Sequence, residues 1–529
     1  MKPSATLVGV LESAREISDS GSFPAMVEHC DWIEVRADLL PELDPAELRE
    51  RWKERRLLYT LQISREETRG CLSLAQRHRK LKKAAEAYDF VNLDAEYDLV
   101  PDVIRVIPPG RRIVSWRGKA AAPEYLETRL GAVTGTPARL FRFEVESGGV
   151  EAGLAALQFL HRVNRADVAA YAEGASGGWT RMLAPRLGAP IAFASVWGES
   201  DPAGLELTIR DLVQDYGFPD LYPVREIFAI IGQPVSGSLS PRVHNGAYQA
   251  SGFGRLFLSF PADSFQEFWN RLVLSGAMEA IGFPIMGLTV VSPHKEAPLE
   301  VATHCAPLCR QCVSSNLLVR RGNEWTASTT DPEGIFHNMS IGHPRPGTKV
   351  AIIGCGGSGR IAAAALRQAG ANVTLVNRGA ERGQWAAQLL GLPFVPLESF
   401  SARGYGAIVN ATPVGRNGEQ LPLNLAELDQ EATVVDMVYN HAGDTALTEQ
   451  ARALGHQVVD GWQILLAQAR RQYYLMTGET MPMSLGRRLL GLPAADGKNG
   501  ALLPHQDRSN DRLSIANFAN LGNGGIHAA

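Results

Sequence analysis

The sequence has few of the features that mark a secreted, membrane-bound or nucleic-acid-binding protein. Its 529 residues include only six cysteines, which indicates reduced thiols rather than a disulfide framework. No apolar run approaches the ~18 residues of a membrane-spanning helix, and the first residues lack the long apolar core of a signal peptide. The formal net charge of −4 gives no reason to expect nucleic acid or an anionic membrane as a partner. We therefore expect a cytoplasmic globular protein.

The cysteines do not predict a metal site either. Cys305, Cys309 and Cys312 recur at i, i+4 and i+7 beside His304, and thiolates with imidazole can bind zinc. This spacing, however, corresponds to one face of a helix, where free cysteine packs as a small hydrophobic side chain. We expect buried core at this place and no metal.

The hydrophobic pattern divides the chain into several parts. Short apolar strands alternate with amphipathic helices through residues 1–220, and eight such units predict an α/β fold that opens with a (β/α)8 barrel. We expect its strands near residues 6–12, 31–37, 57–63, 90–95, 112–117, 138–145, 167–173 and 191–196. A second α/β pattern fills 226–340, and the alternation over 341–460 predicts a doubly wound Rossmann domain. Helices over 461–492 should pack back on the 226–340 domain, and the tail 493–529 is predicted to be disordered.

Glycines mark a dinucleotide-binding turn in the second half of the chain. The apolar residues 350–353 precede an alanine-rich helix, and between them stand Gly354, Gly356, Gly357 and Gly359. Backbone N–H groups and the helix dipole can hold a pyrophosphate at such a turn. The next strand ends in Asn377 and Arg378, where an NAD site usually has an acid for the ribose 2′-hydroxyl. Because the guanidinium of Arg378, with Arg382 one helical turn later, suits a 2′-phosphate, the sequence predicts NADP.

Polar side chains suited to a hydroxylated acid lie between residues 226 and 335. Ser238 and Ser240 follow a strand and open a helix, where both hydroxyls could donate to a carboxylate, although turn and cap serines would look the same. Lys295 follows an apolar strand, and a lysine at a strand end can act in proton transfer. Asp331 stands at another such junction. Each charge alone would be solvated surface, and only the combination favours a site.

These residues belong to a longer series of motifs, and residues 226–490 resemble shikimate dehydrogenase in the order and spacing of that series. The resemblance implies a reversible, NADP-dependent reduction of 3-dehydroshikimate to shikimate, with Lys295 and Asp331 as the acid/base pair at the C3 oxygen. It implies substrate contacts by Ser238, Ser240, Asn316, Tyr439 and Gln468. To the cofactor site it adds Asn410, Thr412 and Gly461.

Two residues depart from the pattern of that family. Val291 stands where the family has a threonine hydroxyl near the substrate, and Leu317 replaces the threonine after Asn316. Losing a hydroxyl that bonds the substrate typically costs ~1 kcal/mol or more. We therefore expect weaker binding or an altered ligand such as quinate.

The first 220 residues resemble type I 3-dehydroquinate dehydratase, the barrel that precedes shikimate dehydrogenase in the plant-type bifunctional enzyme. The resemblance rests on Glu34, Arg36 and Asp38 on the second strand and on residues 174–181 after the seventh. Catalytic groups of such barrels lie at the carboxyl ends of the strands. That enzyme forms a Schiff base between a strand lysine and the substrate ketone, and a histidine moves the protons.

The residues that carry this chemistry are missing at the aligned positions. Arg142 stands in place of the lysine on the sixth strand, and Arg117 in place of the histidine on the fifth. An arginine cannot lose its proton to form an imine. The other positions that differ are Gln62, Asp94 and residues 200–204. Lys119 is the one alternative lysine near the predicted barrel mouth.

Three interpretations of the whole chain stay open. The leading one is a shikimate or quinate dehydrogenase fused to a barrel without lyase activity, which is either a scaffold or an anion site formed by Glu34, Arg36, Arg117, Arg142 and Arg181. A second interpretation keeps both activities, with dehydration through Lys119. A third, a metabolite sensor, is disfavoured because Lys295 and Asp331 are both present. No basic recognition helix is evident, so we expect small-molecule ligands and no DNA.

Overall fold

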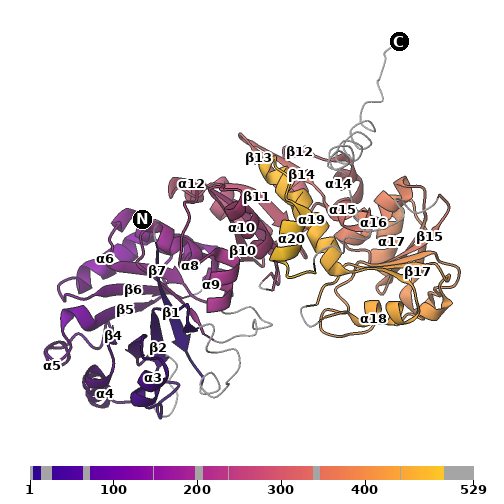
Figure 1. Ribbon diagram of the computed structural model, residues 1–529. Helices are drawn as coiled ribbons and strands as arrows, with labels where there is room; N and C mark the ends of the chain where they lie inside the picture. The colour runs from indigo at the N-terminus through magenta and orange to yellow at the C-terminus, as the bar shows by residue number, and fades with distance from the viewer. Residues whose placement is uncertain are drawn as a thin grey trace. The chain divides into compact units, whose positions relative to one another are not determined.

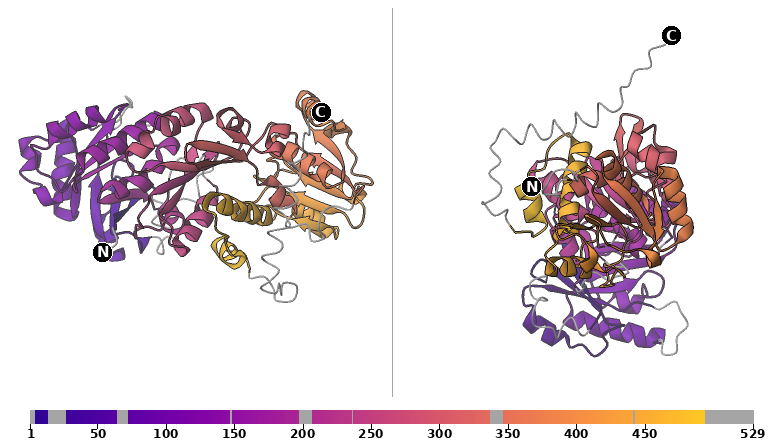
Figure 2. Two further views of the ribbon diagram at one scale, coloured as in Figure 1. Left: turned by 90° about the horizontal axis from the view of Figure 1, so that it is seen from above. Right: turned by 90° about the vertical axis from the view of Figure 1, so that its right-hand side faces the viewer.

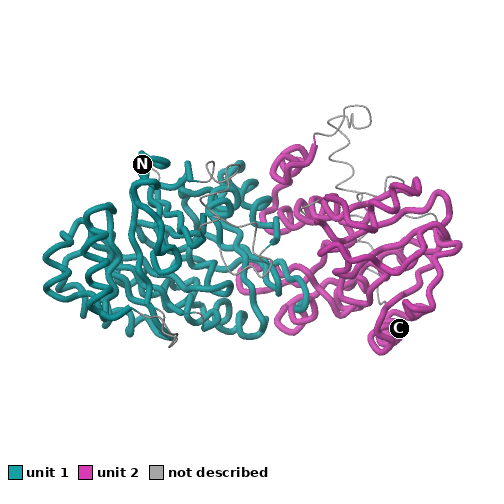
Figure 3. The backbone as a smooth tube through the Cα atoms, turned by 90° about the horizontal axis from the view of Figure 1, so that it is seen from below, with its two compact units in different colours: residues 1–294 teal, residues 295–529 magenta. Residues whose placement is uncertain are grey.

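The computed structural model describes residues 4–13, 27–63, 72–146, 148–196, 207–235, 237–336, 346–440 and 443–493. The chain divides into two compact units, 1–294 and 295–529, coloured teal and magenta in Figure 3. The domain ends that the sequence suggests at 220, 340, 460 and 492 stay predictions. The unusual segment 200–204 and the tail from residue 494 lie outside the described residues. None of the described helices combines the length and the hydropathy that a membrane span requires.

A parallel eight-stranded sheet, curved into a nearly closed barrel, opens the first unit (Figure 1). Its strands are β1 (Thr6–Leu11), β2 (Trp32–Arg36), β3 (Arg56–Thr60), β4 (Phe90–Asp94), β5 (Arg112–Gly118), β6 (Leu140–Val145), β7 (Val168–Ala172) and β8 (Ile191–Ser195). The sheet runs in the order β7-β6-β5-β4-β3-β2-β1-β8, so its two ends are consecutive strands. The predicted barrel is confirmed, and each strand lies within a few residues of its predicted place.

The strand β6 carries polar side chains on the face that points into the barrel. The helices of this part are α3 (Pro45–Arg51), α4 (Leu74–Ala87), α5 (Pro101–Ile104), α6 (Pro123–Val133), α7 (Val150–Val163), α8 (Trp179–Leu183) and α9 (Ile209–Tyr216). All six residues of β6 are buried, and the Phe143 ring contacts Phe159 of α7. Because side chains alternate along a strand, Arg142 and Glu144 point to the opposite face, into the barrel.

Three more parallel strands complete the first unit. They are β9 (Glu226–Gly232), β10 (Arg255–Pro261) and β11 (Ile285–Val290), and β9 pairs with both of the others. The helices here are α10 (Ser240–Ala250), α11 (Phe265–Phe268) and α12 (Ala277–Ala280). The strands consist largely of buried Ile, Leu and Phe, as is typical of parallel strands that are covered on both faces.

The second unit begins with short elements around a hairpin. Strands β13 (Leu317–Arg321) and β14 (Glu324–Ser328) pair antiparallel, and β12 (His304–Cys305) pairs with β14 in parallel. The helices are α13 (Pro298–Val301), α14 (Pro307–Cys312) and α15 (Asp331–Phe336). Cys309 and Cys312 are buried on α14, but the prediction that Cys305 shares their helix face is wrong. Pro307 stands in the first turn of α14, where proline favours a helix start, and Cys305 belongs to β12 instead.

A six-stranded parallel sheet forms the rest of the second unit, in the order β17-β16-β15-β18-β19-β20. Its strands are β15 (Lys349–Ile353), β16 (Asn372–Asn377), β17 (Phe394–Pro396), β18 (Ala407–Asn410), β19 (Thr433–Asp436) and β20 (Gln457–Val459). The helices are α16 (Gly357–Gln368), α17 (Ala380–Leu390), α18 (Ala446–Ala453), and then α19 (Gly461–Thr477) and α20 (Met483–Leu489), which are yellow in Figure 2. Ile352 and Ile353 belong to separate apolar clusters, one on each face of the sheet. This strand order is that of a doubly wound nucleotide-binding fold, and the Rossmann prediction is confirmed.

Candidate active site

A lysine–aspartate pair with a buried carboxylate lies among the polar groups of the second unit. The Lys295 ammonium donates to Asp331 Oδ2 at 3.0 Å and to Ser358 Oγ at 2.6 Å. Asp331 opens α15 and its side chain is 2% exposed, against 15% for that of Lys295. Lys295 Nζ also donates to Asp331 Oδ1 at a longer 3.4 Å, so both carboxylate oxygens face the ammonium group. The pair is thus held in place from both sides.

Two amides fix the Asp331 carboxylate from the other side. Asn316 Nδ2 and Gln468 Nε2 donate to its Oδ1 at 2.8 and 2.9 Å. Asn316 Oδ1 in turn accepts from the Thr330 backbone N–H at 2.9 Å. The structure therefore brings four of the predicted site residues together, Lys295, Asp331, Asn316 and Gln468. Charged hydrogen bonds from fixed donors hold the carboxylate in one orientation.

Three of the four glycines in the turn between β15 and α16 leave no room for a side chain. A Cβ on Gly359 would lie 1.9 Å from the Gly354 carbonyl oxygen, and one on Gly357 would lie 2.4 Å from Ser314 Oγ and 3.1 Å from Lys295 Cβ. At Gly356, in contrast, nothing lies within 4 Å of that position. The turn is open only at the start of the helix, where the first N–H groups have no partner within the helix. These features fit a pyrophosphate.

Asn410 and Thr412 stabilise the loop opposite this turn. Asn410 Nδ2 donates to Asp436 Oδ1 at 2.9 Å, and its Oδ1 accepts from Thr412 Oγ1 at 2.7 Å. A Cβ on Gly354, which has a φ of +104°, would lie 2.7 Å from Thr412 Cγ2. Burial raises the pKa of Asp436, while hydrogen bonds from Thr445 and Asn410 oppose the rise. The two predicted cofactor residues therefore shape the turn through the loop that follows β18.

The residues at the end of β16 suit a ribose that carries a 2′-phosphate. Asn377 Oδ1 accepts from the Cys355 backbone N–H at 3.2 Å, which ties the strand end to the glycine turn. Arg378 and Arg382 are exposed, and neither forms an ion pair with another described residue. Both guanidinium groups are thus available to an outside anion such as a 2′-phosphate.

Tyr439 and Gly461 lie side by side. A Cβ on Gly461 would lie 2.3 Å from the Val438 carbonyl oxygen and 2.5 Å from the Tyr439 backbone nitrogen. The Tyr439 ring centroid is 5.6 Å from that of Trp462. Only glycine lets the start of α19 approach the segment after β19 this closely.

The two predicted substrate serines belong to the first unit. Ser240 is buried at the start of α10, and its backbone N–H donates to Ser238 Oγ at 3.3 Å. Val291, which stands where the family has threonine, packs in the same unit, where its Cγ2 lies 2.4 Å from a Cβ placed on Gly232. Leu317, the other departure, is fully buried at the start of β13.

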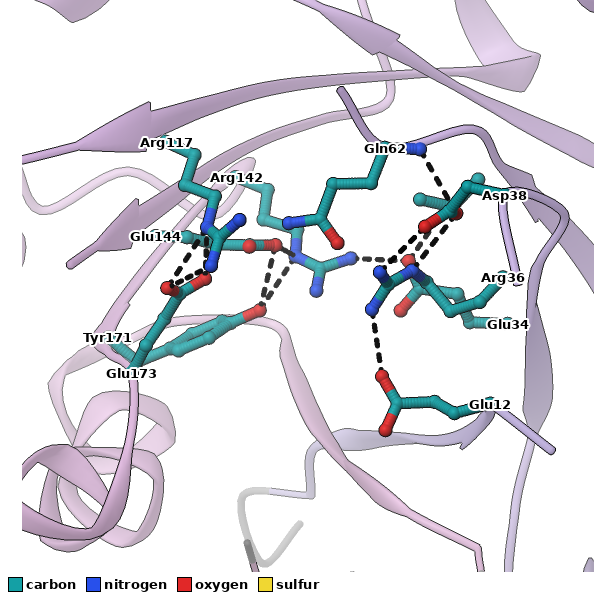
Figure 4. A network of polar contacts seen from close by, with 11 residues as sticks. Glu12, Glu34, Arg36, Asp38, Gln62, Arg117, Arg142, Glu144, Tyr171 and Glu173 are labelled. Atoms are coloured by element: carbon teal, nitrogen blue, oxygen red, sulfur yellow. Dashed lines mark hydrogen bonds and ion pairs between the residues drawn. The ribbon is translucent and has the colours of Figure 1, made fainter. Parts of the chain in front are cut away.

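Inside the barrel, Arg142 is the centre of a network of ion pairs (Figure 4). Its Nη1 donates to Glu34 Oε1 at 2.7 Å and its Nε to the Tyr171 hydroxyl at 2.7 Å, and it also pairs with Glu144. The guanidinium carbon stands 3.8 Å from the centroid of the Phe193 ring. Burial alone would lower the pKa of Arg142, but the Glu144 and Glu34 carboxylates outweigh burial and raise it well above its ordinary value. This side chain is a fixed cation.

The other predicted barrel cations have carboxylate partners as well. Arg117 forms a two-pronged pair with Glu173, with Nε at 2.8 Å and Nη2 at 2.8 Å (Figure 4). Arg36 pairs with Glu12 and Asp38, each at 2.8 Å. Arg181 differs, since its guanidinium lies 4.9 Å from the Tyr171 ring centroid.

Charge balance at the barrel mouth bears on the predicted anion site. Three of the four arginines, Arg36, Arg117 and Arg142, pair with five carboxylates, and these are Glu12, Glu34, Asp38, Glu144 and Glu173. Lys119, the alternative lysine, is exposed just after β5. The predicted anion site stays a prediction, and the guanidinium groups of Arg36, Arg117 and Arg142 would have to leave carboxylates to form it.

The sequence interpretation missed several of these residues. Ser358 lies inside the glycine motif and carries no signal of its contact with Lys295. Arg360, two residues on, is fully buried, and its Nη2 donates to Glu296 Oε1 at 2.7 Å. Glu173 could have been found, because it directly follows β7 at the end of the barrel where catalytic groups lie.

This geometry defines a dinucleotide-dependent dehydrogenase joined to a barrel, and comparisons with known proteins specify it. The family model of type I 3-dehydroquinase matches residues 15–221. Shikimate dehydrogenase (NADP(+)) from Geobacter sp. (strain M21) is 33% identical over 272 residues, which cover 48% of this chain and 91% of that relative. The chain belongs to the shikimate dehydrogenase family.

A relative that is named for both parts also matches. The chloroplastic bifunctional 3-dehydroquinate dehydratase/shikimate dehydrogenase of Arabidopsis thaliana is 27% identical over 336 residues, 59% of this chain. The matched stretch spans 54% of that relative, about half its length.

Solved structures match as well. Shikimate dehydrogenase of Thermus thermophilus in complex with NADP(H) and shikimate is 29% identical, with a TM-score of 0.44. The match covers 50% of this chain and 97% of that one. The dehydroquinate dehydratase and shikimate dehydrogenase of S. pombe covers 93% of this chain and 99% of that one, at 18% identity and a TM-score of 0.41.

Proposed function

We propose that the chain catalyses the reversible, NADP-dependent reduction of 3-dehydroshikimate to shikimate. The observation that carries the proposal is the Lys295–Asp331 hydrogen bond of 3.0 Å, in a site where Lys295 also contacts the glycine turn through Ser358. Family membership supports it, since relatives over this half of the chain are named shikimate dehydrogenase (NADP(+)).

The lysine–aspartate pair would perform the proton transfer at the C3 oxygen. Reduction of a ketone builds negative charge on its oxygen, and a positioned cation stabilises that charge. When bound, NADPH supplies the hydride. Lys295 or Asp331 would give the oxygen its proton, and the hydrogen bond between them lets one group reprotonate the other. In the reverse direction the same pair would take the hydroxyl proton.

The remaining residues would bind and orient the two ligands. The glycines from Gly354 to Gly359 would hold the pyrophosphate, and Arg378 and Arg382 the 2′-phosphate, which favours NADP over NAD. Asn316 and Gln468 use amide N–H groups on Asp331, so their main contribution would be to fix that carboxylate. Ser238, Ser240 and Tyr439 would contact the acid, with Gly461 at the nicotinamide.

The direct test is shikimate-dependent reduction of NADP+, followed at the NADPH absorbance, with quinate in parallel. Quinate is a second candidate because Val291 and Leu317 remove hydroxyls expected near the ligand. Lys295→Ala should lower turnover by about 10²- to 10⁴-fold, the usual effect of removing a general acid, with NADPH binding unchanged. No turnover by the wild-type protein with either acid would favour the sensor interpretation, and full turnover by the variant would contradict the assigned role.

We also propose that the barrel has no 3-dehydroquinate dehydratase activity through an imine. The residue in the lysine's position, Arg142, is a permanently charged arginine that is paired with Glu34 and Glu144. Incubation with 3-dehydroquinate and borohydride, followed by mass spectrometry, tests this directly. We expect no trapped adduct and no enone absorbance, whereas an adduct on Lys119 would establish the bifunctional alternative.

A further inference from the structure

Within the first unit, the last barrel helix lies directly against the helix that begins at Ser240. Arg242 Nε on α10 donates to Asp215 Oδ1 on α9 at 2.6 Å. One turn further along α10, Asn245 Nδ2 donates to the Asp215 carbonyl oxygen at 2.8 Å. Asp215 is therefore held through both its side chain and its backbone, and its side chain is 11% exposed.

Asn245 extends this connection to the sheet. Its Oδ1 accepts from the Phe257 backbone N–H at 2.7 Å, and its Nδ2 also donates to the Phe257 carbonyl at 2.9 Å. One fully buried amide thus joins α9 of the barrel, α10 and β10. Removal of the Asn245 amide would leave its backbone partners in Asp215 and Phe257 without these hydrogen bonds. A buried polar group without a partner costs more free energy than the loss of an exposed hydrogen bond.

The barrel and the strands that follow it also share a buried apolar contact. The Trp179 ring of α8 lies 5.0 Å from the Phe260 ring of β10, and both side chains are 1% exposed. At the end of α9, Gly217 has a φ of +74°, and a Cβ there would lie 2.4 Å from Gln249 Nε2 on α10. Contacts between independent domains are usually more polar and more exposed than this.

We propose that the barrel serves the dehydrogenase as a structural support, in which Asp215 holds α10 and thereby fixes the position of Ser238 and Ser240. A helix is rigid over a few residues, so contacts at Arg242 and Asn245 also determine where the helix begins. Arg242 is then a positioning residue for substrate binding. This inference rests on the proposed function, because it assigns the two serines to the substrate acid. It also gives a barrel without lyase chemistry a role in the reaction of the other half.

The kinetic test compares Arg242→Met with Arg271→Met in the full chain. Arg271 also pairs with the barrel, through Glu151 of α7, but both side chains are well exposed, so this pair should contribute little. We expect Arg242→Met to raise the KM for shikimate by about fivefold or more, with kcat and the KM for NADP+ within about twofold of wild type. Arg242→Lys should recover part of the loss, and Arg271→Met should behave as wild type. An unchanged KM for shikimate, or an equal change in all three constants, would overturn the proposal.

A double-mutant cycle and hydrogen exchange separate this inference from the dehydrogenase assignment. The effects of Asp215→Ala and Arg242→Met on the KM for shikimate should not add, because each variant removes one side of the same contact. Amides of α10 should exchange about tenfold faster in Arg242→Met, a loss of local stability that needs no activity to be seen. If the wild type turns over neither acid, the function fails and exchange alone tests the support. If the wild type is active but the amides of α10 exchange no faster in Arg242→Met than in Arg271→Met, the proposal that the barrel supports α10 is wrong.

Discussion

At the scale of single residues, Lys295 has a partner that an acid/base pair does not require. Ser358 Oγ accepts from its ammonium at 2.6 Å, closer than the 3.0 Å to Asp331 Oδ2. Ser358 stands in the first turn of α16, so the glycine turn and the lysine are in direct contact. Arg360, from the same helix, pairs with Glu296, the residue after Lys295. Two adjacent contacts therefore join α16 to the segment that carries the lysine.

Removing the Ser358 hydroxyl should loosen the ammonium group. We expect Ser358→Ala to lower kcat about tenfold, since one hydrogen bond to a charged group is worth roughly 1.5 kcal/mol, while the affinity for NADP+ changes little. Ser358→Thr, which keeps a hydroxyl, should recover most of the rate. Ser401→Ala is the matched control, because Ser401 bonds the Glu427 carboxylate at the same 2.6 Å on the exposed surface. A kcat of wild-type size in Ser358→Ala would show that Asp331 alone positions the lysine.

At the scale of elements, we expect the carboxyl end of β16 to decide which cofactor is bound. The exposed guanidinium of Arg378 follows that strand, with Arg382 in the first turn of α17. We expect Arg378→Ala to weaken NADP+ binding about tenfold, or about 1.4 kcal/mol, and to leave NAD+ binding unchanged. Fluorescence titration with both nucleotides measures this. Equal losses for the two nucleotides would mean that Arg378 does not contact the 2′-phosphate.

The contact between α9 and α10 should also make stability depend on pH. Burial raises the pKa of Asp215 to about 6, above the ordinary 3.8, although Arg242 opposes the rise. The folded state therefore holds this proton more tightly than the unfolded chain does, and ionisation costs stability, by about 3 kcal/mol above pH 6. The cost falls as the pH drops through 6 and is gone below about pH 4.

The comparison that checks this is urea unfolding of wild type and Asp215→Asn at pH 7 and pH 5. Asparagine cannot ionise, so the stability of the Asp215→Asn variant does not include the cost of ionising this side chain. From pH 7 to pH 5 the wild type should gain about 1 kcal/mol relative to the variant. Parallel changes in the two proteins would mean that Asp215 titrates as an ordinary exposed aspartate.

The sequence predicted the elements better than their contacts. The eight barrel strands and the glycine turn could be found because each depends on a local pattern of apolar residues, glycines and spacing. The pairs inside the barrel could not, since Arg117 and Glu173 are 56 residues apart and Arg142 and Glu34 are 108 apart. Charge type alone predicted a cationic mouth, whereas the fold brings carboxylates from other strands to three of the four arginines. Likewise, nothing local indicates that Arg242 on α10 meets Asp215.

At the scale of the whole molecule, the chain joins a part with shikimate dehydrogenase relatives, which contains the Lys295–Asp331 pair, to a barrel whose described polar groups bond one another. Such a barrel can persist if its contacts serve the rest of the chain. The absence of imine chemistry that we propose for the barrel is then not only a matter of two substituted residues. Around Arg142, Glu34 accepts from Thr60 Oγ1 at 2.6 Å, and Tyr171 donates to Glu144 at 3.2 Å. These side chains form a set that is adapted to a permanent cation.

Restoring the two missing residue types should therefore not restore dehydration. In Arg142→Lys with Arg117→His, the new lysine would lie near the Glu34 and Glu144 carboxylates, which favour its charged form. A protonated amine does not attack a ketone, so we expect neither enone formation from 3-dehydroquinate nor a borohydride-trapped adduct. The same assays at raised pH are the control, because an amine that merely holds its proton would begin to form the imine there. Dehydratase activity at neutral pH in the double variant would show that the pocket is otherwise intact and that these two substitutions alone silenced it.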